Sequence, residues 1–391
     1  MTTERPITIL ALASEYKGIP FLQECKRQGC HVIVLVTAEH KDQPWPHEAI
    51  DEFFDMPDVR TQPDLTYAVS FLARDRRIDR IMALDDYDVE HAADLREHLR
   101  LEGMGHTAAR LFRDKLAMRT HAKKNGIKVP EFVGIFNYDD IRAFMGQANP
   151  PWVFKPRMLA GSEGIRKLED GEQLWRLLDE MGDQKSYYLL EQFIEGDVFH
   201  VDALVWDGEV VFSLVSQYGT PPMATFHGRK VFTTRVLPRD AEDAVALRAF
   251  NEQLVKTMGR TYGPTHTEFI KAADGTFYFL ETAARVAGGN IEKLIEAATG
   301  LVIWQEAARM EIADIRGEAY TLPELREEYG GLIACFSNSE YADTSAYNDP
   351  EVMFRPRAKK FASLVVGSPS YERVEELLAQ YAERFVQDFM S

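Results

Sequence analysis

The first hundred residues of the chain alternate between two hydrophobic periods. Short β-branched runs of strand length are followed by segments in which apolar residues recur at helical spacing. This pattern predicts strands at residues 7–13, 31–36 and 80–84 and helices at residues 18–28, 63–76 and 87–100. Such alternation is typical of a doubly wound parallel sheet, which binds ligands beyond the carboxyl ends of its strands. Asp85 and Asp86 follow the last of these strands, where they either face a ligand or cap the next helix.

After Gly103-Met104-Gly105 the pattern changes to mixed strands and helices, so the predicted fold class is α/β followed by α+β. Helices are predicted from Thr107 to about Gly126 and at residues 171–181, 241–258 and 371–389, the last one within a small mixed tail at 320–391. Strands are predicted at residues 132–135, 152–155 and 188–191 and in a hairpin of residues 198–206 and 209–216. Asp274-Gly275 marks the turn of a second hairpin.

Composition and charge narrow the choice of partners. The 391 residues include 45% hydrophobic and 27% charged residues, which is ordinary for a globular protein, and their length suggests more than one packed unit. The net charge of −17 argues against nucleic acid and anionic membrane as partners. Three sparse cysteines, the lack of a long apolar segment and an N-terminus without a basic region favour a cytoplasmic protein.

The second hairpin carries the strongest chemical signal. Glu268 and Glu281 lie on its two predicted strands, and Arg285 follows four residues after the second carboxylate. Two carboxylates on adjacent strands can hold divalent cations such as Mg²⁺, which take carboxylate and phosphate oxygens as ligands. The arginine can hold an anion beside these cations. The hairpin therefore predicts the metal and phosphate end of an ATP site.

Two earlier segments fit the rest of such a site. Lys155 ends a strand and precedes a small-residue turn with Gly161, Ser162 and Gly164, whose backbone N–H groups either cover a triphosphate or form an ordinary hairpin turn. It is not a Walker loop, because GxxxxGK[ST] is absent. Residues 188–196 form an extended apolar segment that can present backbone groups to adenine.

The order of these motifs resembles the ATP-grasp superfamily, and in particular its carboxylate–amine ligase branch, of the L-amino acid ligase type. The resemblance covers nearly the whole chain. It implies a pre-ATP-grasp domain at residues 1–105, a small subdomain at 106–195, a large subdomain with the metal site at 196–318 and a C-terminal extension at 319–391. It also makes a homodimer through the first domain an option.

The resemblance further assigns roles to single residues. Lys115 and Lys155 match the lysines that contact the α- and β-phosphates, and residues 160–164 match the glycine-rich lid loop. Adenine is taken by a hinge that matches Glu191, Gln192 and Ile194. Glu268 and Glu281 match the Mg²⁺ ligands, with Mn²⁺ as an alternative metal. Arg285 matches the arginine that holds the reacting carboxylate or acyl phosphate, and His266 faces that acyl phosphate in relatives.

The sequence departs from the family pattern at two positions. The asparagine that often follows the second carboxylate is Ala283 here, which puts the number of metal ions in question. The acid that usually binds ribose, seven residues after the hinge acid, is Val198 here. Glu195, Asp197 or His200 could replace it, and Asp197 is our assignment for ATP.

The predicted function is therefore an ATP-dependent ligase that joins a small carboxylate, such as an amino acid, to an amine through an acyl phosphate, releasing ADP and phosphate. A kinase or carboxylase with the same ATP apparatus, or a non-catalytic nucleotide-binding module, is the alternative. Residues 216–235 are expected to form a loop beside the pocket or a solvated loop. Tyr218, His227 and Arg235 in this segment, together with Gly288, are the predicted substrate contacts.

Overall fold

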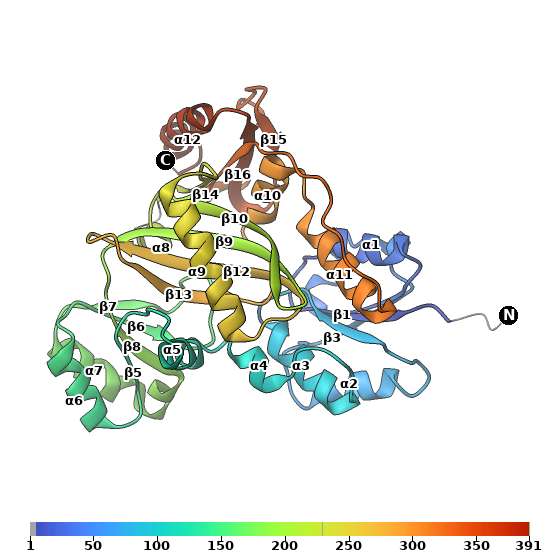
Figure 1. The fold of residues 1–391 in the computed structure, drawn as a ribbon, viewed down its shortest axis with the longest axis horizontal. Helices are drawn as coiled ribbons and strands as arrows, with labels where there is room; N and C mark the ends of the chain where they lie inside the picture. Colours follow the sequence, from blue (N-terminus) through green and yellow to red (C-terminus); the bar gives the residue numbers. More distant parts are fainter. Residues whose placement is uncertain (1–4, 229, 391) are drawn as a thin grey trace.

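The N-terminal part of the protein is a parallel sheet covered by helices on both faces (Figure 1). The computed structural model describes residues 5–228 and 230–390. The strands, in the order β3-β2-β1-β4, are β1 (Thr8–Ala13), β2 (His31–Thr37), β3 (Glu52–Met56) and β4 (Arg80–Ala83). The connecting helices are α1 (Ile19–Arg27), α2 (Asp64–Leu72) and α3 (Asp88–Leu99), with short turns η1 (Ala38–His40) and η2 (His47–Ala49). The predicted doubly wound sheet is confirmed.

Alternate residues of each strand point to opposite faces of this sheet, and both faces carry apolar side chains. Helices pack on both faces and bury them. Ile9 of β1 packs in the same cluster as Phe21 of α1, whereas Leu10 packs with Val69 of α2 and Leu95 of α3. β1 pairs in parallel with both β2 and β4. The ends of β1 and β4 therefore lie side by side at the point where the strand order reverses, which is where open α/β sheets bind ligands.

The single helix predicted from Thr107 to about Gly126 is wrong. The structure has two helices here, α4 (His106–Arg110) and α5 (Lys115–Lys124). Asp114 lies between them with an extended backbone, and its carboxylate accepts hydrogen bonds from the backbone N–H groups of Leu116 and Ala117. An aspartate in this position caps a new helix, so the chain restarts at Lys115 rather than continuing the earlier turn.

A small antiparallel sheet follows, with two helices packed against it (Figure 1). Its strands, in the order β5-β8-β6-β7, are β5 (Phe132–Gly134), β6 (Trp152–Pro156), β7 (Arg166–Leu168) and β8 (Tyr188–Gln192). The helices are α6 (Tyr138–Gln147) and α7 (Gly171–Met181), and η3 (Gly182–Tyr187) leads into β8. Ile141 of α6 and Leu174 of α7 are fully buried against Phe154 of β6, so one apolar core fixes the position of the following loop.

A large antiparallel sheet occupies the centre of the molecule. In spatial order its strands are β13 (Phe277–Ala283), β12 (Gly263–Ala272), β9 (Gly196–Trp206), β10 (Glu209–Tyr218), β11 (Phe232–Val236), β14 (Tyr329–Tyr341), β16 (Lys359–Ser368) and β15 (Val352–Phe354). The associated helices are α8 (Pro222–Gly228), α9 (Glu242–Met258), α10 (Ile291–Thr299), α11 (Ile303–Arg316) and α12 (Tyr371–Phe385), with η4 (Val386–Met390) after the last. The strands β12 and β13 form the acidic hairpin that carries Glu268 and Glu281. The strands of the predicted C-terminal extension, β14 to β16, continue the same sheet.

Two further predictions of local structure are corrected. Residues 216–235 are not a loop: β10 extends to Tyr218, α8 follows, and β11 begins at Phe232. The last helix was predicted to run from 371 to 389, but its α-helical part ends at Phe385. The four domain boundaries themselves stay a prediction.

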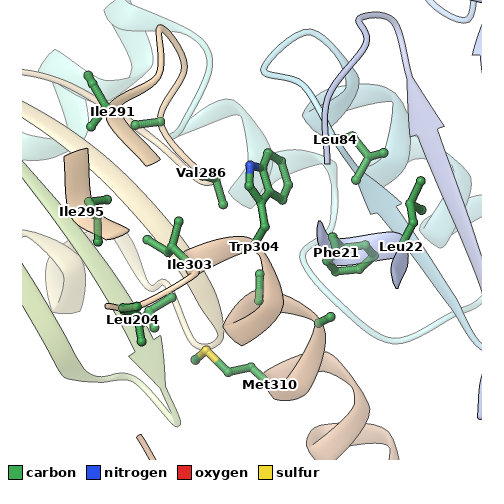
Figure 2. Packing of buried hydrophobic residues seen from close by; sticks show 14 of the residues in the cluster. Phe21, Leu22, Leu84, Leu204, Val286, Ile291, Ile295, Ile303, Trp304 and Met310 are labelled. Atoms are coloured by element: carbon green, nitrogen blue, oxygen red, sulfur yellow. The ribbon is translucent and has the colours of Figure 1, made fainter. Parts of the chain in front are cut away.

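One hydrophobic core joins the N-terminal sheet to the large sheet. Figure 2 shows Phe21 of α1 and Trp304 of α11 in this cluster, with Leu204 of β9 below them. Arg309 of α11 adds an ion pair with Glu24 of α1, with 2.9 Å between Nε and Oε1. This packing holds the ends of β1 and β4 against the large sheet. None of the helices in residues 5–228 and 230–390 is long and apolar enough to span a bilayer.

Candidate functional site

The two predicted metal-binding carboxylates face each other across one strand pair. Glu268 of β12 and Glu281 of β13 are direct partners in the antiparallel register. The Tyr218 hydroxyl donates to Oε1 of Glu268 at 2.7 Å, and Nζ of Lys115 lies 3.2 Å from Oε2 of Glu281. Burial alone would raise the pKa of Glu268, but the hydrogen bonds and charges of its neighbours, His266 first, together lower it. Glu268 is therefore poised as a charged oxygen ligand, and Glu281 faces it from the next strand.

A first cavity of about 230 Å³ lies between the small sheet and the large sheet. Nearly every residue predicted to bind ATP lines it, together with both glutamates. These lining residues are Lys115, Lys155, Gly161, Ser162, Glu191, Gln192, Ile194, Glu268 and Glu281. The structure thus brings together side chains that are up to 166 positions apart in the sequence, from Lys115 to Glu281.

Two predicted ATP residues do not line this cavity. Asp197 is exposed at the start of β9, whereas Val198 and Glu195 face the cavity. Asp197 is therefore a poor assignment for ribose, because a strand places successive side chains on opposite faces. Gly164 shapes the loop instead: its φ is 70°, and a Cβ there would lie 2.9 Å from Cγ of Pro156.

The side chain of Glu191 has a different role from the predicted adenine contact. Its carboxylate is shared between two buried bases, with Nζ of Lys155 at 2.5 Å and Nε of Arg119 at 3.1 Å. Burial lowers the pKa of Lys155 to about 8, although Glu191 opposes the shift. Glu191 is therefore a counter-ion for the cavity's cationic end, and only the backbone of this hinge remains for a base. Arg119, on the amphipathic helix α5, gave no distinctive sequence signal.

A second cavity of about 380 Å³ adjoins the first, and Glu268 and Glu281 line both. Its other walls come from the large sheet and from the ends of β1 and β4, where Lys17, Asp85 and Asp86 lie. The structure thus supports the ligand-facing alternative for the two aspartates. Of the predicted catalytic and substrate residues, those that line this cavity are His266, Arg285, Tyr218 and Gly288.

Arg285 is held in this cavity by a residue of the N-terminal sheet. Its Nε donates to Oδ1 of Asp86 at 3.1 Å, and its Nη1 donates to the carbonyl of Val286 at 3.0 Å. The other oxygen of Asp86 pairs with Arg113, whose Nη2 donates to the carbonyl of Met158. Asp86 therefore fixes one edge of the Arg285 guanidinium and leaves Nη2 for an anion in the cavity.

Two predicted substrate residues are not brought to this cavity. Arg235 of β11 points toward α12, where Nε lies 2.9 Å from the Tyr371 hydroxyl and 2.9 Å from Oε1 of Glu375. Its charge is used in holding that helix, so the predicted substrate contact is not supported. The side chain of His227, in α8, lies outside the described residues.

A buried polar chain behind His266 was missed by sequence reasoning. Nδ1 of His266 lies 2.8 Å from Oδ1 of Asp202, and Nδ1 of His200 lies 2.7 Å from Oδ2 of the same carboxylate. Nε2 of His200 then reaches the Thr234 hydroxyl at 2.8 Å. Burial opposes the charge of His266, but Asp202 and Glu268 outweigh it and raise the pKa of His266 to about 9.

The spacing of these two histidines and the aspartate also suits a metal ion. Their facing atoms, however, are already engaged in hydrogen bonds with one another, so the group is best described as a support for His266. Alternation along β9 and β12, which places all three on one face, is the signal that could have revealed it.

Comparison with known proteins relates part of the chain to a described family. Residues 148–293 match the family described as the ATP-grasp domain. This segment, which carries the hinge and the acidic hairpin, is an ATP-grasp domain. It is 25% identical over 313 residues to an L-arginine-specific L-amino acid ligase of Bacillus subtilis, a match that covers 78% of this chain and 75% of that protein. It is also 25% identical over 294 residues to an alanine–anticapsin ligase of the same species, covering 68% and 59%.

A solved structure shows the same architecture over the full length. The crystal structure of an L-amino acid ligase from Bacillus licheniformis superposes with a TM-score of 0.78 at 18% identity, covering 99% of this chain and 98% of that one. The predicted fold and the predicted enzyme class, an ATP-grasp ligase, are confirmed by these similarities. Substrates and residue roles remain to be argued from the site itself.

Proposed function

We propose that the protein is an ATP-dependent carboxylate–amine ligase that works through an acyl phosphate. The observation that carries this proposal is that Glu268 and Glu281 line both the first and the second cavity. A triphosphate in the first cavity would end beside this pair, and a carboxylate held by Arg285 in the second cavity would meet it there. Such a shared wall is what phosphoryl transfer between two bound substrates requires.

The first cavity suits a nucleotide. Lys155 and Lys115 supply the positive charge for phosphate oxygens, and the backbone of the loop at residues 160–164 supplies N–H donors. The hinge at Gln192 and Ile194 offers backbone groups to adenine between apolar walls. We assign ribose binding to Glu195, which lines the cavity, rather than to Asp197, which does not.

The donor set fits magnesium. Two charged carboxylates in register on adjacent strands leave room for phosphate oxygens and water, which is how Mg²⁺ is usually held in nucleotide sites. Bound there, the metal would neutralise charge on the transferring phosphoryl group. Tyr218 holds one oxygen of Glu268 and Lys115 contacts Glu281, so both carboxylates are oriented in advance. Because Ala283 offers no oxygen, we expect fewer protein ligands than in relatives with asparagine there.

The second cavity suits the reacting carboxylate. Arg285 would orient it so that one oxygen attacks the γ-phosphorus while the bond to the β,γ-bridging oxygen breaks and ADP leaves. His266, held by Asp202 in its charged form, would stabilise the resulting acyl phosphate. An amine would then attack the carbonyl carbon, lose a proton and expel inorganic phosphate, leaving an amide.

The decisive experiment measures ADP release with amino acids supplied singly and in pairs. We expect release that depends on two co-substrates and yields one amide and one phosphate per ADP. Release with a single co-substrate and a stable phosphorylated product would indicate a kinase instead. Dependence on bicarbonate and a biotinylated partner would indicate a carboxylase. Nucleotide binding without any release would indicate a binding module.

A further inference from the structure

A third cavity of about 520 Å³ opens beside the second. The two cavities share the wall residues Lys17, Gly288 and Gly289. A Cβ at Gly289 would meet nothing within 4 Å, and one at Gly288 would meet only Nζ of Lys17, at 3.9 Å. Both glycines therefore border space that no other side chain fills, on the wall that the two cavities share.

The walls of the third cavity are mostly apolar and aromatic. Ile19 and Pro20 of α1 line one side, and Ile303 and Trp304 of α11 line the other, with Tyr16 at the end of β1. Figure 2 shows Trp304 projecting from the start of α11 beside Val286. Trp304 is 8% exposed, so its ring is fixed by packing rather than free in solvent. Such walls suit the methylene groups of an extended side chain.

One carboxylate in this cavity lacks a cationic partner. Glu292, in the first turn of α10, lines the cavity, and no ion pair reaches it within residues 5–228 and 230–390. The two lysines of the cavity are already used: Lys17 pairs with Asp85, and Nζ of Lys293 lies 2.7 Å from Oε2 of Glu296. Burial raises the pKa of Glu292, which shows that its charge is poorly compensated.

We propose that the third cavity receives the side chain of an amino-acid substrate and that Glu292 selects a side chain ending in an ammonium or guanidinium group. The cation would form a charge-assisted hydrogen bond with Glu292, while its methylene groups pack against the apolar walls. The backbone of the substrate would pass Gly288 and Gly289 so that its reacting group lies near Arg285. This inference rests on the proposed function and adds the substrate class.

The test compares a cationic side chain with a neutral one of the same shape. L-Arginine and L-citrulline are titrated into the protein with ADP and Mg²⁺, and their Kd values are measured by calorimetry. The unmodified protein is expected to bind arginine at least about tenfold more tightly. Glu292→Gln is expected to bring the ratio close to one. Glu324→Gln, the same change at an exposed glutamate outside the cavity, is expected to preserve the ratio.

The outcomes separate this inference from the proposed function. Equal affinity for the two ligands in the unmodified protein, or an unchanged ratio in Glu292→Gln, would overturn the cavity assignment. ADP release that depends on two neutral amino acids would then still support the ligase. Conversely, arginine binding that depends on Glu292, without ADP release for any pair, would uphold the cavity and refute the ligase.

Discussion

The first and second cavities each contain one buried acid that is shared by two bases, but this acid comes from a different part of the chain in each cavity. In the first cavity Glu191 sits between Lys155 and Arg119, and all three belong to residues 115–191. In the second cavity the shared acid is Asp86, at the end of β4 in the N-terminal sheet, and it holds Arg285 from the acidic hairpin. The proposed nucleotide site is therefore built from two neighbouring sheets, whereas the position of Arg285 depends on a third, the N-terminal sheet.

A substitution in the wall that the two cavities share should have the largest effect on activity. Glu281→Gln replaces a charged metal ligand with a neutral amide, so ADP release is expected to fall on the order of 10³-fold. A coupled ADP assay measures this. Asp274→Asn, the same change in the exposed turn of the same hairpin, serves as the control and should keep full activity. Near-normal activity in a folded Glu281→Gln protein would remove the metal assignment.

The two shared acids provide a matched pair. Glu191→Gln and Asp86→Asn each remove one buried anion, so each should lower the stability by roughly 3–5 kcal/mol. Their kinetic effects should differ: Glu191→Gln is expected to raise KM for ATP, and Asp86→Asn to lower kcat/KM for the carboxylate substrate on the order of 10²-fold. Steady-state kinetics against each substrate separates them. If both variants changed only ATP binding, the two cavities would not be distinct in function.

The buried chain behind His266 should give an intermediate effect. Asp202→Asn cannot hold the charged imidazole in the same way, so kcat is expected to fall about 10–100-fold while the Kd for ATP stays constant. Asp207→Asn, in the turn of the same hairpin, is the control. A loss confined to ATP affinity would place His266 in nucleotide binding rather than in stabilising the intermediate.

The smallest expected effect is the dependence of the Kd for ATP on pH. Because burial lowers the pKa of Lys155 to about 8, the protonated fraction falls as pH rises through that value. The Kd for ATP should therefore rise by up to about tenfold per pH unit above pH 8, since one phosphate-binding charge is lost. Titration calorimetry from pH 7 to 9 measures this. Lys155→Arg should flatten the profile, and an equally steep profile in that variant would contradict the assignment.

The same comparison explains what the sequence could predict. The turn at Asp274-Gly275 and the pattern around it predicted that Glu268 and Glu281 lie on adjacent strands of one hairpin. A register shift between Glu268 and Phe269, which the pattern did not predict, makes them direct partners. Lys155 and the loop after it were predicted from a short, strongly patterned segment, whereas the role of Lys115 was implied by the family resemblance. Arg119 could not be found, because an ordinary helix arginine acquires a role only through tertiary packing. Alternation along β9 places Asp202 on the same face as His200, but its contact with His266 also required the pairing of β9 with β12.

The errors have local causes as well. The earlier helix ends at Arg110 and Asp114 caps the next one, but the apolar spacing on both sides looked continuous. Arg235 was grouped with the substrate residues because it is basic and near Tyr218, yet side chains of adjacent strands can point to different partners. Glu292 gave no signal at all, because its importance depends on the two lysines around it being paired elsewhere.

The central claim is that a carboxylate oxygen captures the γ-phosphoryl group of ATP where the two cavities meet. It is tested most directly with a substrate whose carboxylate is labelled with ¹⁸O, by mass spectrometry of the inorganic phosphate after turnover. One labelled oxygen is expected in each phosphate released. Label found in AMP, or unlabelled phosphate together with amide product, would contradict it.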